Sequence, residues 1–124
     1  MNKEKNEIIL FENQDVKLEV NVKDETVWLT VEQMATLFNT TKRNVEMHIK
    51  NIYIEEELGE EGTWKEFFQV QKEGKRKVKR IRKLYNLDMI ISIGYRVKSK
   101  NGVIFRQWAN KILKDYMLKG YAVN

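Results

Sequence analysis

The segment 40–51, "TTKRNVEMHIKN", carries cationic, amide and apolar side chains at helical spacing. If it is a helix whose apolar side faces a core, Arg43, Met47 and Lys50 point outward, at about 100° per residue. Arginine suits guanine edges, asparagine suits adenine, and an apolar group suits the thymine methyl. The outward face and its flanks comprise Arg43, Asn44, Met47, Lys50 and Asn51. This composition predicts contact with bases in the major groove of DNA.

Three further residues lie where this helix would begin. Thr40, Thr41 and Lys42 combine hydroxyl groups and a cation with the free N–H groups of a helix N-terminus, a combination that holds phosphate. The alternative is an ordinary helix with a solvated polar face. Glu46 would repel phosphates. His48 lies about 60° from the core direction, so we interpret it as a packing residue in preference to a base contact.

A second group of cations lies in residues 72–83, "KEGKRKVKRIRK", which contain eight Lys or Arg and one Glu. A turn around Gly74 would make this segment the end of a β-hairpin, and a basic hairpin after two helices resembles the wing of a winged-helix domain. The alternative is a charged edge strand that prevents aggregation, although eight cations exceed that need. The predicted phosphate contacts are Lys75, Arg76, Lys77 and Lys79.

The elements that position these groups begin with three strands. Residues 16–22 alternate apolar and polar side chains, as in a half-buried strand. Residues 26–29 can return beside them as the second strand of a hairpin, and residues 8–11 are a candidate third strand.

A pair of helices follows. Thr30 and Gln33 form a capping-box pattern that starts the first helix. That helix ends near Asn39, because asparagine tolerates the left-handed conformation of a sharp turn. The second helix opens at Thr41 or the threonine before it and continues to about Ile54.

The next segment predicts another hairpin. Residues 63–70 read as a strand with Trp64, Phe68 and Val70 pointing inward. Residues 78–85 can return as its partner. The alternation of this second strand is imperfect, which indicates either a bulge or a strand exposed on both faces.

The C-terminal part reads as two helices. Asn86 can cap a short helix that stops at Gly94, and a basic connection leads to a helix from about Gly102 to Leu118, with Gly120 as its stop. The predicted buried side of the last helix consists of Phe105, Trp108, Ala109, Ile112 and Tyr116.

Composition excludes several classes of function. The chain has 124 residues and a net charge of +5. It has no cysteine, and His48 is its only histidine, so the residues needed for Cys-based zinc sites and for Cys/His catalysis are absent. No nucleophile motif is present, and the Glu-rich residues 55–61 lack the pattern of a calcium loop. We expect no enzyme activity, metal or cofactor. Without a long apolar run or a signal peptide, we expect a cytoplasmic protein with no membrane association.

These observations predict a single α+β domain over residues 1–124, a winged-helix-like fold with an additional C-terminal helical part. Its predicted parts are a helix-turn-helix at 29–54, a basic wing-like hairpin at 63–85 and C-terminal helices at 86–120.

Two stretches carry a family resemblance: "ETVWLTVEQMATLFNTTKRNVEMHIKNI" at 25–52 and "YNLDMIISIGYRVKSKNGVIFRQWANKILKDYMLKGYAV" at 85–123. They resemble the N-terminal region of the RhuM-type virulence protein family, bacterial proteins often found on islands and mobile elements. The second stretch is also similar in pattern to the Bro-N type domains of phage antirepressors. The resemblance implies DNA-linked regulation. Asn39 stands where family members commonly have glycine, and members are usually much longer.

The resulting hypothesis is sequence-specific binding of double-stranded DNA by a transcription regulator or a regulator of the mobile-element or phage type. Helix 41–52 would read the major groove and the 72–83 hairpin would hold phosphates, as a homodimer if the target is palindromic. The alternative is a protein-interaction module of the antirepressor kind, whose basic surface meets an acidic protein partner.

Overall fold

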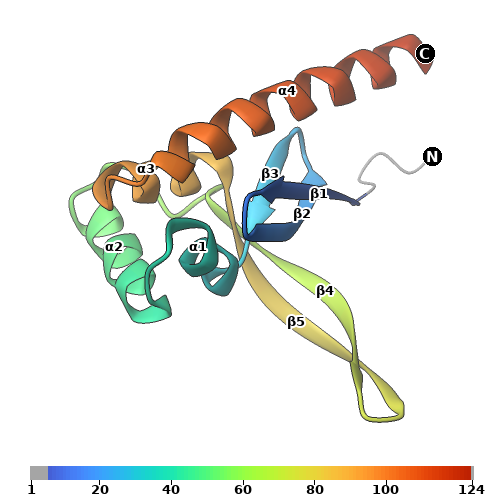
Figure 1. Cartoon of the computed structure of the whole chain (residues 1–124), viewed down its shortest axis with the longest axis horizontal. Helices are drawn as coiled ribbons and strands as arrows, with labels where there is room; N and C mark the ends of the chain where they lie inside the picture. The colour runs from blue at the N-terminus through green and yellow to red at the C-terminus, as the bar shows by residue number, and fades with distance from the viewer. Residues whose placement is uncertain (1–5, 124) are drawn as a thin grey trace.

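The computed structural model describes residues 6–123, with side chains described up to residue 118, and shows a mixed α+β fold (Figure 1). Five strands form one antiparallel sheet in the order β1-β2-β3-β5-β4. The α+β class is therefore confirmed. The strands are β1 Glu7–Asn13, β2 Val16–Lys23, β3 Thr26–Leu29, β4 Trp64–Glu73 and β5 Arg76–Asn86. The helices are α1 Val31–Phe38, α2 Lys42–Ile54, α3 Leu87–Arg96 and α4 Lys100–Val123.

The first three strands form a meander because their alternation gives them one apolar face. Leu18, Val20 and Val22 of β2 are buried on the side that faces the helices, and Phe11 of β1 lies opposite Leu18. All three predicted N-terminal strands are confirmed.

The four helices contribute to one hydrophobic core that covers this face of the sheet. Figure 1 shows α4 lying above the sheet and extending beyond it. The rings of Phe105 and Trp108 lie 5.1 and 5.2 Å from that of Phe11, in edge-to-face contacts that fix α4 on β1. Within residues 6–123, no helix is long and apolar enough to cross a membrane.

The opposite face of the sheet has a small apolar cluster of its own. Trp28 of β3, Phe67 of β4 and Leu84 of β5 are buried together, and the rings of Trp28 and Phe67 lie 5.6 Å apart. This cluster joins the hairpin of β4 and β5, which we call the basic hairpin, to the rest of the sheet.

The helix pair α1 and α2 follows the local signals of the sequence. The Gln33 N–H donates to the Thr30 hydroxyl at 3.0 Å, and the Thr30 N–H donates to the Gln33 side chain at 2.9 Å, so the capping box is confirmed. Asn39 adopts the left-handed conformation with φ 54° and ψ 51°. The Thr40 N–H then donates to the Ala35 carbonyl at 2.9 Å, which closes the turn.

The predicted roles of two glycines are wrong. α3 does not stop at Gly94 but continues to Arg96, and α4 continues through Gly120. α4 begins at Lys100, two residues before the predicted start near Gly102. Gly94 is buried within its helix, where a Cβ atom would lie 3.1 Å from the Phe38 ring and 3.3 Å from the Gly102 backbone. Close packing of α3 on α4 therefore requires glycine at this position.

The predicted inward side of β4 is correct at Trp64, which packs against the core, and wrong at the two residues beyond it. Phe68 and Val70 are 72% and 62% exposed, Trp64 is half-buried, and the buried residue is Phe67. The reason is that the basic hairpin extends past the helical layer (Figure 1), so side chains on its outer half have no layer to pack against. Its register is continuous from the Trp64–Tyr85 pair to the tip. The irregular alternation of β5 thus reflects exposure on both faces, and no bulge interrupts the pairing.

Candidate nucleic-acid interface

Helix α2 separates an apolar face from a polar face as its spacing predicts. Val45, Ile49 and Ile52 are buried in the core. Arg43 and Lys50 are exposed, and Met47, between them, is 47% exposed. The structure thus brings the three predicted outward residues onto one accessible strip. Their contact with base edges stays a prediction.

The start of α2 is organised by hydrogen bonds within the chain. The Asn44 N–H donates to the Thr41 hydroxyl at 3.0 Å, and the Asn44 side-chain amide donates to the Thr40 hydroxyl at 2.9 Å. These bonds are typical of helix capping. Thr41 keeps its hydroxyl proton and Asn44 its amide oxygen for other partners. Asn44 is half-buried, as is Asn51 at the other end of the strip.

One of the predicted phosphate contacts, Lys42, forms an ion pair within the protein. Its Nζ lies 3.1 Å from the Glu32 carboxylate of α1, and both side chains are more than half exposed. Partial burial raises the pKa of Glu32, but its own backbone N–H, the hydrogen bond from Lys42 and the charges of Lys42 and Arg82 outweigh burial and leave the pKa below its usual value. Glu32 thus stays ionised and offsets part of the Lys42 charge.

His48 lies beside this strip and is half-buried. Its Nδ1 is a buried atom without a hydrogen-bond partner among the described residues. This position agrees with the packing role that its angle on the helix predicts.

The outer part of the basic hairpin presents the predicted cations to solvent. Lys75, Arg76, Lys77 and Lys79 are all exposed. Arg76 lies opposite Glu73 in the strand register, across a two-residue turn in which Gly74 has φ 63°. The Glu73 carboxylate accepts from Arg80, at 2.7 Å. A positive φ at the first turn position suits glycine and matches the twist of a tight hairpin.

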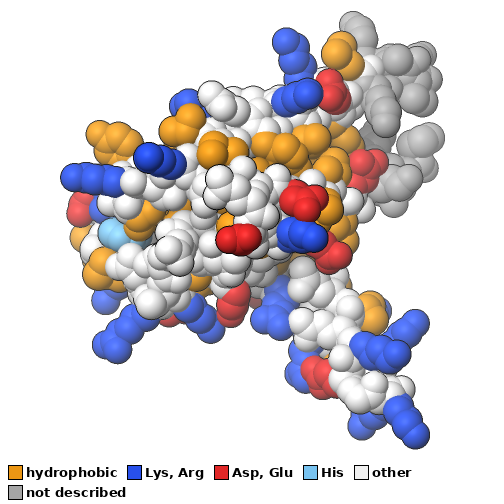
Figure 2. Space-filling model, viewed as in Figure 1, with side chains coloured by type: hydrophobic (Ala, Val, Ile, Leu, Met, Phe, Trp, Pro, Cys, Tyr) orange, Lys and Arg blue, Asp and Glu red, His pale blue; other side chains and the backbone are white. Residues whose placement is uncertain are grey.

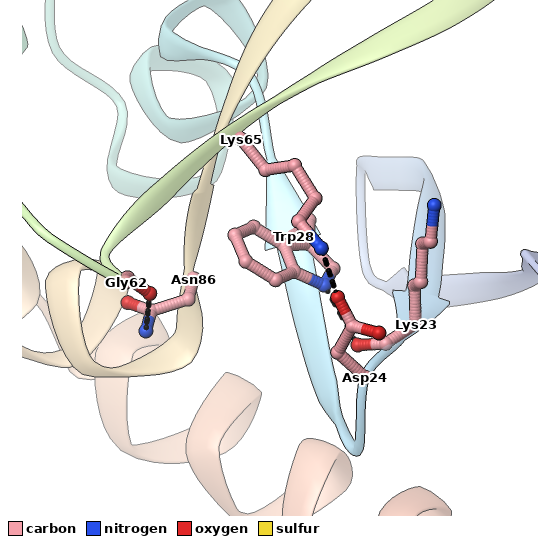
Figure 3. A network of polar contacts seen from close by, with 6 residues as sticks. All are labelled: Lys23, Asp24, Trp28, Gly62, Lys65 and Asn86. Atoms are coloured by element: carbon pink, nitrogen blue, oxygen red, sulfur yellow. Dashed lines mark hydrogen bonds and ion pairs between the residues drawn. The ribbon is translucent and has the colours of Figure 1, made fainter. Parts of the chain in front are cut away.

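The base of the basic hairpin is tied to two neighbouring segments (Figure 3). The Lys65 ammonium of β4 pairs with the carboxylate of Asp24 in the β2–β3 turn, where the Trp28 indole N–H also donates to the Lys23 carbonyl at 2.9 Å. On β5, the Asn86 amide donates to the Gly62 carbonyl at 3.1 Å. These bonds hold the two hairpin strands at the end that joins the rest of the sheet.

The Asn86 side chain has a second role. Its oxygen accepts from the Met89 N–H at 3.1 Å and caps α3, as its sequence position predicts. One side chain therefore fixes the base of the basic hairpin and the start of a core helix.

A groove of about 300 Å³ separates α2 from the base of the basic hairpin. Lys50 lines it from α2 and Lys83 lines it from β5, so one end of the cationic strip of α2 and one face of the hairpin border the same space. Glu46 and Glu60 also line the groove and make it partly acidic. Burial raises the pKa values of the two lining phenols, those of Tyr53 and Tyr85, so both stay neutral near pH 7.

Lys and Arg side chains project from the basic hairpin and from the lower edge of the helical part of the molecule (Figure 2). The two groups of predicted contacts are nevertheless separate, since the hairpin tip and α2 project as distinct elements (Figure 1). A ligand that meets both groups must be extended.

One polar contact of the acidic segment had no signal in the sequence. A single nitrogen of the Arg96 guanidinium, at the end of α3, donates to Glu55 and Glu57 at 2.8 Å each. The contact ties the segment after α2 to α3. Among the described residues, no group of three or more acidic, His or Cys side chains is arranged to hold a metal ion.

The fold and this surface define a mixed α+β protein with an exposed cationic helix face and a projecting basic hairpin. The sequence model of the Virulence protein RhuM family matches residues 62–124, about half of the chain. The chain therefore belongs to that family, and the resemblance carried by residues 85–123 is confirmed. The match does not include residues 25–52, and the similarity to Bro-N type domains stays a prediction.

No curated protein and no solved structure shows significant similarity to the chain.

Proposed function

We propose that this RhuM family protein binds double-stranded DNA in a sequence-specific way, in the manner of a winged-helix regulator. α2 is the reading helix, with Arg43, Met47 and Lys50 toward base edges in the major groove. The basic hairpin is the wing, and its lysines and arginines contact phosphates. We assign the domain a binding role and no catalytic reaction.

The observation that carries this proposal is the common groove of Lys50 and Lys83. It means that the flank of α2 that carries Lys50 and one face of the basic hairpin are turned toward the same space. A duplex is an extended ligand with regularly spaced negative charge, so it can meet both elements at once. The carboxylates of Glu46 and Glu60, which also line the groove, disfavour entry of the phosphate backbone into it.

Selection from a random pool of short duplexes tests the proposal. We expect salt-sensitive binding by fluorescence anisotropy at two salt concentrations, and an enriched sequence motif in the bound fraction. Binding without an enriched sequence motif would mean that the protein binds DNA non-specifically. Absence of binding at low salt would remove the proposed function.

The reading helix is tested by the double variant Arg43→Ala/Lys50→Ala. A well-placed side chain contributes about 1–3 kcal/mol of discrimination between bases, so the variant should lose most of its preference for the selected motif while keeping weak binding to any duplex. The matched control is Lys111→Ala/Lys114→Ala, which removes two exposed lysines from α4. Undiminished discrimination by the Arg43/Lys50 variant would reassign α2 to a purely structural role.

A second candidate function is protein interaction, and one surface favours it. α3 and α4 border a cavity of about 320 Å³ that is lined by Ile91, Tyr95, Val103 and two cations, Lys98 and Arg106. Tyr95 is 84% exposed and Val103 is 50% exposed. An acidic protein with an apolar anchor, or a second copy of the chain, could dock there without use of α2. Retention of such a partner by the Arg43/Lys50 variant would separate this function from DNA binding.

A further inference from the structure

The two faces of the basic hairpin differ in chemistry. Residues directly opposite each other in an antiparallel pair share a face. One face carries the pairs Phe68–Ile81 and Val70–Lys79, with the Glu66–Lys83 pair on the base side and the Lys72–Lys77 pair on the tip side. Glu66 is the one acidic residue of this face between Trp64 and the Lys72–Lys77 pair. The other face carries glutamines and arginines, among them the Gln69–Arg80 pair. We call the first of these the lysine face.

The lysine face exposes a patch of large apolar side chains. Phe68 is 72% exposed, Val70 is 62% exposed and Ile81 is 58% exposed. The three residues are neighbours in the register, so they form one continuous stripe. Val70 borders a cavity that it shares with Ile8 of β1 and Gln33 of α1, and the stripe nevertheless stays largely exposed. Side chains of this size rarely stay in water as a group unless they serve a contact.

Cations stand on both sides of the apolar pair Phe68–Ile81. Lys79 and Lys83 lie four residues apart on β5, a separation of about 13 Å along the strand. The Lys79 ammonium lies 6.0 Å from the centre of the Phe68 ring, and the Lys83 ammonium lies 4.3 Å from that of Trp64. Both ammonium groups therefore keep to the same face as the apolar stripe.

This face is also the one turned toward α2. Lys83 and Tyr85, which belong to it, line the groove that Lys50 and Tyr53 border from the helix. A duplex that rests on this flank of α2 can therefore reach the apolar stripe. The choice of partner follows from charge: an apolar protein surface would have to desolvate four lysines, whereas a DNA groove offers phosphates on both rims and uncharged base edges between them.

We propose that Phe68 and Ile81 form an apolar wedge that enters the minor groove, partly unstacks a base step and bends the duplex. This inference rests on the proposed DNA binding. Lys79 and Lys83 contact phosphates on the two rims, which are separated by a groove about 6 Å wide. Insertion of apolar side chains between base steps bends DNA toward the major groove. The bend wraps the duplex onto α2 and adds specificity for deformable sequences.

The test uses the full chain and the duplex selected for α2, labelled with a dye at each end. We expect energy transfer between the dyes to rise when the wild-type protein binds, because the ends approach each other. A 2-aminopurine base at the kinked step should brighten as it unstacks. The double variant Phe68→Thr/Ile81→Thr should leave the duplex straight and the 2-aminopurine dark, and should weaken binding by about tenfold.

Two controls make the result interpretable. Val78→Thr removes an apolar side chain from the opposite face of the same strand, and this variant should bend DNA as the wild type does. The unfolding temperature of the Phe68/Ile81 variant should match that of the wild type, since both side chains are mostly exposed. Threonine keeps the strand propensity of the hairpin.

The outcomes separate this inference from the proposed function. If the wild type binds no duplex, the proposed function fails and the wedge fails with it. If the wild type binds without bending, or if the Phe68/Ile81 variant bends DNA equally well, the wedge alone is overturned. Tighter binding of single strands than of duplex, abolished in the same variant, would replace the wedge by a stacking surface.

Discussion

Gly94 is the residue at which a local reading of the sequence and the packing of the protein diverge most clearly. Glycine after an apolar helical run is a common stop signal, yet α3 continues past it. What requires glycine is the approach of α4, whose Gly102 backbone would lie 3.3 Å from a Cβ atom at position 94. The Phe38 ring of α1 closes the same space from another side. Three helices thus pack closely around Gly94, because this residue has no side chain.

Substitution of the two glycines should have opposite effects on stability. Gly94→Ala forces the Phe38 ring and the Gly102 backbone to move, and such overpacking costs about 1–3 kcal/mol, which exceeds the gain of about 1 kcal/mol in helix propensity. A Cβ atom on Gly102 would lie 3.4 Å from the Gly94 Cα and 3.7 Å from the Phe38 ring, which is ordinary contact. Gly102→Ala should therefore be neutral or slightly stabilising.

Urea unfolding of both variants measures the difference. Equal stability of the Gly94→Ala variant and the wild type would show that α3 and α4 separate at little cost, and would contradict the close-packing role of Gly94.

At the scale of the element, the basic hairpin combines a rigid base with an unsupported outer half. The Trp28, Phe67 and Leu84 cluster and the pair of Lys65 with Asp24 hold the base. Beyond them the strands pair only with each other, so the shape of the outer half depends on register and on the Gly74 turn. An element that is fixed at one end and charged along its length is suited to follow a phosphate backbone.

Neutralising the hairpin tip should change how binding depends on salt. The change of Lys75, Arg76, Lys77 and Lys79 to Gln should weaken binding to every duplex alike. It should also flatten the slope of log K against log salt by about 0.9 for each phosphate that the protein no longer neutralises. Anisotropy titrations over a series of salt concentrations measure the slope, with Lys111→Ala/Lys114→Ala as the control. A slope equal to that of the wild type would exclude the tip from the interface.

At the scale of the whole molecule, charge is segregated. The acidic segment 55–61 lies between α2 and β4, whereas the densest group of cations lies on the basic hairpin. Arg96 joins the acidic segment to α3 through Glu55 and Glu57. The segment is thereby held to the helical part while the basic hairpin stays free to meet an anionic partner.

The Arg96 contact predicts that the stability of the protein depends on pH. Hydrogen bonding from Arg96, and then from Ser92, lowers the pKa of Glu57. A carboxyl whose pKa is lower in the folded state contributes stability above its unfolded pKa of about 4.3, and loses it as pH falls through the folded pKa. Glu57→Gln should therefore lower the unfolding temperature slightly at pH 7, and the difference between the two proteins should disappear as the pH falls through the folded pKa.

Thermal unfolding at pH 7, 5 and 3 checks this prediction. Glu61→Gln is the control, because Glu61 is exposed and outside the ion pairs found among the described residues. A constant difference between Glu57→Gln and the wild type at all three pH values would mean that the Arg96 contact contributes nothing through ionisation.

The sequence by itself determined the features that depend on near neighbours. The Thr30–Gln33 capping box, the left-handed Asn39 turn and the Asn86 cap each involve residues only a few positions apart. The local sequence therefore predicts them. The two faces of α2 were predictable for the same reason, because a helical period needs only one apolar side. Membership of the RhuM family was likewise carried by a continuous stretch of sequence.

Only the tertiary structure decided which side of each element became buried when the sequence offered two choices. Phe67 and Phe68 are adjacent, and the sequence cannot tell which one finds the partners Trp28 and Leu84 and which one projects beyond the helices. Gly94 and Arg96 acquire their roles from Gly102 and Glu57, residues supplied by other segments. Burial depends on neighbours that the fold brings together from distant parts of the chain, and a local sequence pattern does not specify those neighbours.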